Sequence, residues 1–208
     1  MSSRPKRLVA AIVAALALLW AGVASAAPAG TVVGLFGACR VEHGGASSAV
    51  RLGARVAVGD TIDVPAGGKL KLRLADGSIV SLASGSRLTI TALRVSPAGQ
   101  RENAELRLAQ GLLRAVVTPV EQPARFEVKT AVGTAAVRST DWFVSASRAA
   151  MQVGVLRGSV VLTSAATGEN VVIPARWGAR LEAGHDPVPP RLWSRAEFAA
   201  VIARTNVP

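Results

Sequence analysis

The chain has 208 residues, with 24 Lys and Arg against 13 Asp and Glu, and a formal net charge of +11 at neutral pH. Its single cysteine excludes an internal disulfide, and its length suffices for one domain whose core needs no covalent staple. Aromatic residues make up only 4% of the chain, which argues against nucleic acid as a partner, because single-strand binders stack bases on aromatic side chains.

The N-terminus has the three parts of a secretory signal. A basic start at residues 4–7 precedes an apolar run at 8–23, and small residues at 24–26 form a cleavage site. We therefore predict a signal peptide over residues 1–26 and a periplasmic or secreted protein with no transmembrane span after cleavage. The alternative is an uncleaved N-terminal helix that anchors the chain in the inner membrane. Cleavage leaves 21 basic residues against 13 acidic ones, a net charge of +8.

Residues 27–184 are typical of a series of short strands. At residues 69–74 three leucines alternate with three cations, the period of a strand with one buried face. The segments 72–77, 106–111 and 153–158 share one plan, in which an apolar strand end is followed shortly by a glycine that opens a new strand. We predict an all-β domain, built as a twisted β-helix-like stack or as a flattened double-layer sheet.

Between residues 126 and 163 four or five short strands follow one another, with few groups that could serve catalysis. Small polar residues at 137–141 break the alternation, which indicates a turn or bulge. Gly158 marks a second tight turn, because glycine adopts positive φ without a steric penalty. The residues that carry this pattern are Phe126, Val128, Thr130, Val137, Arg138, Thr140, Asp141, Trp142, Phe143 and Gly158.

This pattern resembles the FecR domain, whose core runs roughly F-x-V-x-T-P, then V-R-G-T-x-F-x-V, then V-x-V-x-x-G-x-V-x-V. Upstream, residues 59–62 and 74–82 resemble the family's G-D-x-I and L-x-D-G-S-x-V-x-L segments. The resemblance covers about residues 55–163. Ala131 and Ser139 depart from it, since the family usually has Pro and Gly at these positions.

The resemblance implies an extracytoplasmic domain. The named regulators of the family carry a cytoplasmic segment that contacts a sigma factor ahead of a membrane helix, and their periplasmic part senses an outer-membrane receptor. Only seven residues precede the apolar run of this sequence. We therefore expect the FecR-like domain without direct transmembrane anti-sigma signalling.

Residues 185–208 combine a Pro-rich spacer with a short amphipathic helix. Ser194 and Glu197 have the spacing of a capping box. Because an isolated helix of about ten residues is marginal in water, this one must dock, either on its own β-domain or on a partner. The apolar residues placed for docking are Trp193, Phe198, Val201 and Ile202.

The sequence offers little to an enzyme. His43 and His185 stand apart from any plausible nucleophile with an orienting group, and the spacings of zinc sites and phosphate loops are missing. We predict a non-enzymatic protein with no cofactor and no metal.

Two electrostatic features remain as hypotheses. Cations on one strand face, extended by neighbouring strands, form a candidate surface for anions or a partner; alternatively, they are solvated side chains paired with acids across strands. We also expect Arg138 and Asp141 to pair across the turn between them. The residues of the candidate surface are Lys69, Lys71, Arg73, Arg87 and Arg107.

Together these features predict an extracytoplasmic binding domain that recognises a protein or a cell-envelope component, as an accessory to cell-surface signalling. The alternative is an envelope-structural protein, or one that binds glycans or other anionic polymers through its basic surface.

Overall fold

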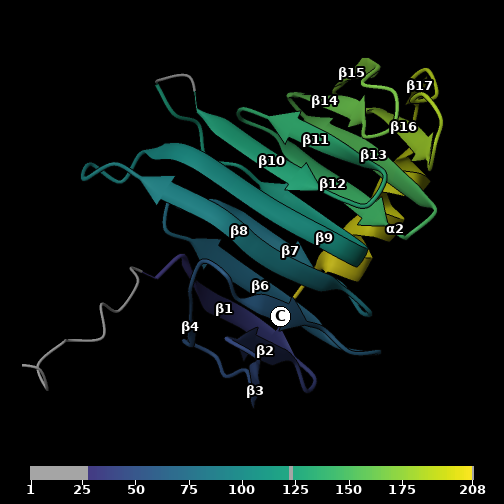
Figure 1. Ribbon diagram of the computed structural model, residues 1–208. Helices are drawn as coiled ribbons and strands as arrows, with labels where there is room; N and C mark the ends of the chain where they lie inside the picture. The colour runs from purple at the N-terminus through teal and green to yellow at the C-terminus, as the bar shows by residue number, and fades with distance from the viewer. Residues whose placement is uncertain (1–27, 122–123, 208) are drawn as a thin grey trace, which may run out of the picture.

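The computed structural model describes residues 28–121 and 124–207, so the predicted signal peptide lies outside the described residues. The described part is built of short strands with one C-terminal helix, which confirms the predicted all-β class (Figure 1). No helix in this part is long and apolar enough to cross a membrane.

The strands form two layers, each an open sheet. Sheet A contains, in spatial order, β4 (Arg55–Val56), β1 (Gly30–Phe36), β6 (Lys69–Leu74), β7 (Ile79–Leu82), the second half of β9 (Arg101–Val116), β12 (Asp141–Ala146), β13 (Ala150–Arg157), β16 (Trp177–Glu182) and β17 (Arg191–Leu192). Sheet B contains β3 (Ala46–Ala49), β2 (Arg40–His43), β5 (Thr61–Asp63), β8 (Arg87–Val95), the first half of β9, β10 (Arg125–Lys129), β11 (Gly133–Val137), β14 (Ser159–Ser164) and β15 (Asn170–Pro174).

Strand β9 belongs to both layers. Its first half pairs with β8 and, in parallel, with β10, whereas residues 111–116 pair with β7 and β12. The change of layer occurs at Gly111, which has φ +100°. A Cβ at this position would lie 2.4 Å from the side chain of Ser86, so no larger residue fits here. This crossing closes the two sheets onto each other at the middle of the fold.

One apolar core lies between the layers. The leucines of β6 point inward from sheet A, and Leu106 and Leu108 of β9 point inward from sheet B. The cations that alternate with the β6 leucines point outward, as the strand period predicts. Of the two predicted architectures, the flattened double layer is the one observed.

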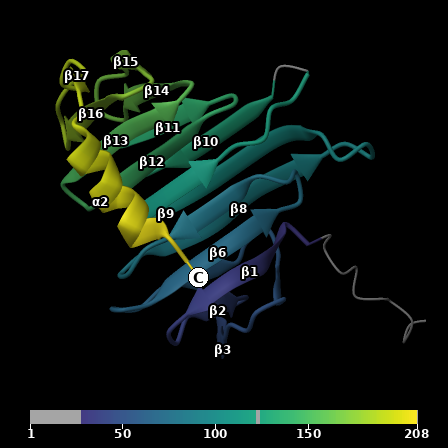
Figure 2. The same ribbon diagram turned by 180° about the vertical axis from the view of Figure 1, so that it is seen from behind.

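Helix α2 (Arg195–Thr205) lies across the outer face of sheet A (Figure 2). The predicted capping box is confirmed: Ser194 Oγ accepts the Glu197 N–H at 3.2 Å, and the Glu197 carboxylate accepts the Ser194 N–H at 2.8 Å. Trp193 and Phe198, with ring centroids 5.5 Å apart, form the hydrophobic staple at the start of the helix. Both rings pack on Phe143, which points outward from β12.

Candidate functional site

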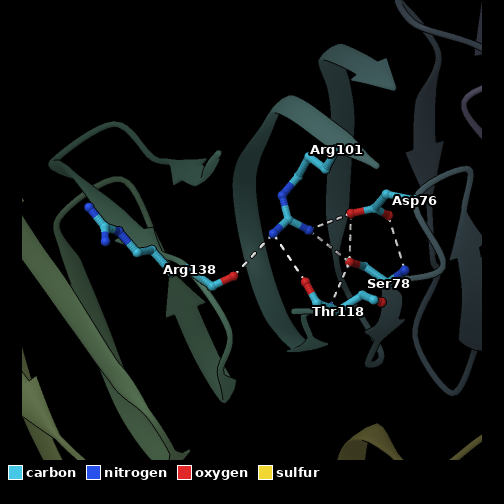
Figure 3. Close-up of polar contacts among 5 residues, drawn as sticks. All are labelled: Asp76, Ser78, Arg101, Thr118 and Arg138. Atoms are coloured by element: carbon cyan, nitrogen blue, oxygen red, sulfur yellow. Dashed lines mark hydrogen bonds and ion pairs between the residues drawn. The ribbon is translucent and has the colours of Figure 1, made fainter. Parts of the chain in front are cut away.

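The two segments that resemble the FecR pattern, 74–82 and 137–140, meet at a buried group of polar residues, here called the motif cluster (Figure 3). Arg101, at the start of β9, lies at its centre. Its Nη1 donates to Asp76 Oδ2 at 2.5 Å and to Ser78 Oγ at 3.3 Å. Its Nη2 donates to the carbonyl oxygens of Thr118 at 3.2 Å and of Arg138 at 3.0 Å.

Within the motif cluster the charges are sealed from solvent, since the side chains of Arg101 and Asp76 are both 0% exposed. Asp76 also accepts hydrogen bonds from the N–H and the hydroxyl of Ser78, at 3.0 and 2.8 Å. The Arg101 guanidinium lies 5.4 Å from the centroid of the Phe126 ring. The Nε of Arg101 is buried and has no hydrogen-bond partner among the described residues. A buried pair needs additional bonds of the kind made by the other groups, so this cluster is a structural element.

The turn at 138–140 is fixed from two sides. Arg101 holds the Arg138 carbonyl, and the Thr140 hydroxyl donates to the Ser159 carbonyl at 3.2 Å. Gly158, with φ +86°, packs directly beneath, where a Cβ would lie 2.6 Å from the Ser139 carbonyl oxygen. The predicted turns at 137–141 and at Gly158 are therefore confirmed, and they support each other.

The other residues of the family pattern are structural in this fold. The Thr130 hydroxyl closes its own turn through the Gly133 carbonyl at 3.1 Å, and Phe143 lies under α2. The pattern residues in the core between the layers are Phe126, Val128, Val137 and Trp142.

The expected pair between Arg138 and Asp141 does not form. Asp141 instead accepts two bonds from Arg114, both at 2.9 Å, and lies 3.7 Å from Arg157. Arg114 of β9 and Asp141 of β12 lie diagonally opposite each other on neighbouring strands, and both side chains are on the outer face of sheet A. The Arg138 side chain, in contrast, points away from the motif cluster and is exposed (Figure 3). The prediction chose Arg138 as the partner of Asp141 because it is close in the sequence, but the partner is Arg114 on the neighbouring strand.

A groove lies beside the turn, on the outer face of sheet B, with a volume of about 590 Å³. We call it the motif groove. Ala136 and Val161, paired across β11 and β14, contribute apolar walls. Arg125, Glu127 and Arg138 add charged groups at the same place. Arg125 and Glu127 are joined by a 3.4 Å contact, whereas Arg138 forms no ion pair within the described ranges.

The five predicted basic residues do not form one surface. Lys69, Lys71 and Arg73 point outward from sheet A, whereas Arg87 and Arg107 point outward from sheet B, on the opposite side of the core. The prediction placed these strands in one layer, but the chain crosses from sheet B to sheet A within β9.

Three of these cations also have intramolecular partners. Lys69 donates to the carbonyl oxygens of Ala203 and Asn206 at 3.0 Å each, and Lys71 to that of Val207 at 2.8 Å. These bonds hold the C-terminal end of α2 on sheet A. Arg87 pairs with Asp63 and Glu42 on neighbouring strands of sheet B.

The predicted helix residues lie against the chain's own β-domain. Trp193 and Phe198 are buried in a small cluster with Leu112 and Phe143, and Val201 packs partly against it. Ile202 is half-buried and lines a separate groove beside α2.

No group of three or more metal-ligating side chains occurs among the described residues. His43 contacts the Asp60 carboxylate at 2.5 Å in an exposed hairpin, and His185 bonds the Ala183 carbonyl. Burial raises the pKa of the Cys39 thiol above its ordinary value, an effect opposed in part by a backbone hydrogen bond with Lys69. A thiol with a raised pKa is a weak nucleophile.

Sequence reasoning missed Arg101, the centre of the motif cluster. The apolar alternation at Ala104, Leu106 and Leu108 would place residue 102 inward and Arg101 outward. A bulge intervenes, because β8 pairs Arg94 with Asn103 and Val95 with Arg101, skipping Glu102. An extra residue in a strand moves the side chains that precede it to the opposite face of the sheet. No local sequence signal indicated the extra residue here.

Comparisons with known proteins agree with this geometry. A family model described as FecR protein matches residues 60–161, which include every residue of the motif cluster. No curated protein matches the chain. Two crystal structures of a candidate anti-sigma factor from Parabacteroides distasonis ATCC 8503 have a similar fold, with TM-scores of 0.56 and 0.55 and 18% identity over 67% of this chain.

The matched region covers 63% and 62% of the two crystallised chains, so this chain spans less than two thirds of their length, and the likeness concerns the fold alone. The range matched by the family model includes the segments that build the motif cluster and its turn. Residues 60–161 therefore form a FecR domain.

Proposed function

We propose that this chain is a non-enzymatic, extracytoplasmic binding domain that recognises a protein partner through the motif groove, as an accessory to cell-surface signalling. The observation that supports this most is the placement of Arg138. Its backbone is held by the buried Arg101, while its side chain lies at the groove with no ion-pair partner among the described residues. Because the backbone at Arg138 is already fixed, binding there does not require ordering of the main chain, which favours recognition.

The chemistry of the motif groove suits a protein segment with acidic groups. Its walls combine apolar side chains with two arginines and one glutamate, and Val172 extends the exposed apolar surface from Val161 to the next strand. Arginine forms paired hydrogen bonds with carboxylates, which gives such a contact geometric specificity. The names of the two similar crystal structures, and the family itself, support a signalling role.

The extracytoplasmic location in this proposal rests on the secretory pattern of residues 1–26. The alternative function, binding of glycans or other anionic polymers, has less support, because the basic residues lie on two opposite faces and Lys69, Lys71 and Arg87 have intramolecular partners.

A binding assay separates these functions. The chain would be titrated with the purified signalling domain of a TonB-dependent receptor and, separately, with peptidoglycan and an acidic polysaccharide. We expect the receptor domain to bind, and Arg138→Glu to weaken that binding by about tenfold, the equivalent of one lost charge-assisted contact.

The matched control is Arg148→Glu, which makes the same charge change at an exposed turn outside the motif groove. Equal losses in the two variants would show that only net charge matters. Binding to the polysaccharide alone would replace the proposed function by the alternative.

A further inference from the structure

A second groove, on the opposite side of the molecule from the motif groove, has no role in the proposed function. It runs beside α2 on the outer face of sheet A and has a volume of about 360 Å³. We call it the helix groove. Leu156 of β13 and Trp193 form apolar parts of its lining.

One side of the helix groove is a face of α2 itself. Arg195, Ala199 and Ile202 are spaced four and three residues apart, which places them along one stripe of a helix. Phe198, beside this stripe, anchors the helix to sheet A. The small Ala199 in the middle leaves room for side chains from another molecule. Helix α2 thus uses one face to dock on its own domain and offers another to the groove.

Two cations border this apolar surface. Neither Arg176 nor Arg195 forms an ion pair with any described residue, although the nearby Arg157 and Arg191 have partners in Asp141 and Glu197. Arg176 has φ +72°, a conformation that is unfavourable for a residue with a Cβ. It is the second residue of the two-residue turn between β15 and β16, and this turn accounts for the conformation.

Two backbone hydrogen bonds fix the position of Arg176. Its N–H donates to the Val155 carbonyl at 2.7 Å, and its carbonyl accepts the Trp193 N–H at 3.0 Å. The first bond ties it to β13 and the second to the segment that leads into α2. The guanidinium therefore starts from a fixed point between the strand and the helix that line the groove.

From these observations we infer that the helix groove binds an amphipathic helix of a partner protein, whose apolar side chains enter between α2 and β13 and whose flanking carboxylates pair with Arg176 and Arg195. The groove is open to solvent, whereas pockets for small ligands enclose most of the ligand. An open apolar trough along a helix is suited to helix-in-groove recognition. The unpaired arginines specify acidic residues in the partner.

The test selects helical peptides from a display library on the full chain and removes those that also bind Ala199→Trp, which fills the groove. Selected peptides should carry an apolar stripe at helical spacing, flanked by Asp or Glu. Ala200→Trp is the matched control, because it places the same side chain at the next exposed position of α2, outside the lining. Because the peptides are chosen for failing to bind Ala199→Trp, the informative result is that of Ala200→Trp, which we expect to leave binding unchanged.

Charge reversal gives a second measurement. Arg195→Glu should weaken peptide binding by about tenfold, whereas Arg51→Glu, in an exposed turn outside the groove, should change it less than about twofold. An acidic residue in the first turn favours a helix, so a loss at position 195 cannot be attributed to unfolding of α2.

Three results would overturn the inference: no peptide that distinguishes the two tryptophan variants, selected peptides with basic flanks, or binding of anionic lipid vesicles in place of peptides. The motif groove should bind its partner equally well in Ala199→Trp, so this test is independent of the proposed function.

Discussion

Replacing Arg101 by methionine tests whether the motif cluster holds the FecR domain together. Methionine keeps most of the side chain's volume but removes the guanidinium that pairs with Asp76 and binds the carbonyls of Thr118 and Arg138. The Asp76 carboxylate would then be a charge with 0% exposure and no cation beside it. Ser78 would still donate to it, but two neutral donors do not replace a buried charge partner.

The expected cost follows from this burial. Removing one partner of a buried ion pair destabilises a protein by about 3–5 kcal/mol, because the remaining charge is left uncompensated. For a domain of this size, each kcal/mol lowers the melting temperature by about 2–4 °C. Arg101→Met should therefore melt about 6–20 °C below the wild type. It should also loosen the turn at 138–140 and so weaken binding at the motif groove.

The measurements are thermal and chemical denaturation of both proteins, each followed by circular dichroism. Arg107→Met is the matched control, since Arg107 lies on the same strand with an exposed side chain and should change stability by less than about 0.5 kcal/mol. If Arg101→Met cost less than about 1 kcal/mol, the cluster would not be a structural element. A double variant that also replaces Asp76 by alanine should recover part of the loss, because no charge then remains stranded.

Three further changes should have measurable effects. Gly158→Ala should destabilise the domain in denaturation experiments by more than Gly168→Ala: both glycines have positive φ, worth about 1–2 kcal/mol of strain, but only at 158 would the new methyl group meet backbone. The Arg191 side chain and then the Ser194 N–H lower the pKa of Glu197 from 4.5 to about 2. Because the pKa of Glu197 is lower in the folded state, its contribution to α2 docking is complete above about pH 4.5 and disappears as the pH falls towards 2. Protease resistance should therefore decrease over this pH range in the wild type, and Glu197→Gln should abolish the decrease. Gly178→Ala would place a methyl group 2.1 Å from the Trp193 indole, so it should increase cleavage of the spacer before α2, and an unchanged cleavage rate would contradict the close packing.

Local patterns sufficed for much of the fold. The alternation at residues 69–74 predicts β6 with its buried leucines, and Ser194 with Glu197 predicts the start of α2. These elements depend on side-chain period and capping, which are properties of a few neighbouring residues. The docking of α2 could not be decided in this way. It depends on Gly154 and Gly178, where the absence of a Cβ makes room for Phe143 and Trp193.

The candidate site was less predictable, because it depends on the crossing of β9. Gly111 moves the strand from sheet B to sheet A, and the bulge at Glu102 turns Arg101 inward. Both events change which face a residue occupies without changing the local alternation. For the same reason the basic residues at 87 and 107 were assigned to the face of β6, although they lie on the other side of the core.

The motif cluster also explains what the FecR pattern specifies. Asp76 and Ser78 lie in one segment and Thr140 in another, far along the chain, and Arg101 joins them by holding the Arg138 carbonyl. Most of the pattern is therefore needed to form the fold. Arg138 is the exception, because only its backbone takes part in the cluster and its side chain is exposed. Under the proposed function, partner specificity would come from groups such as Arg138 and from the outward-facing residues around it, whose positions the fold sets.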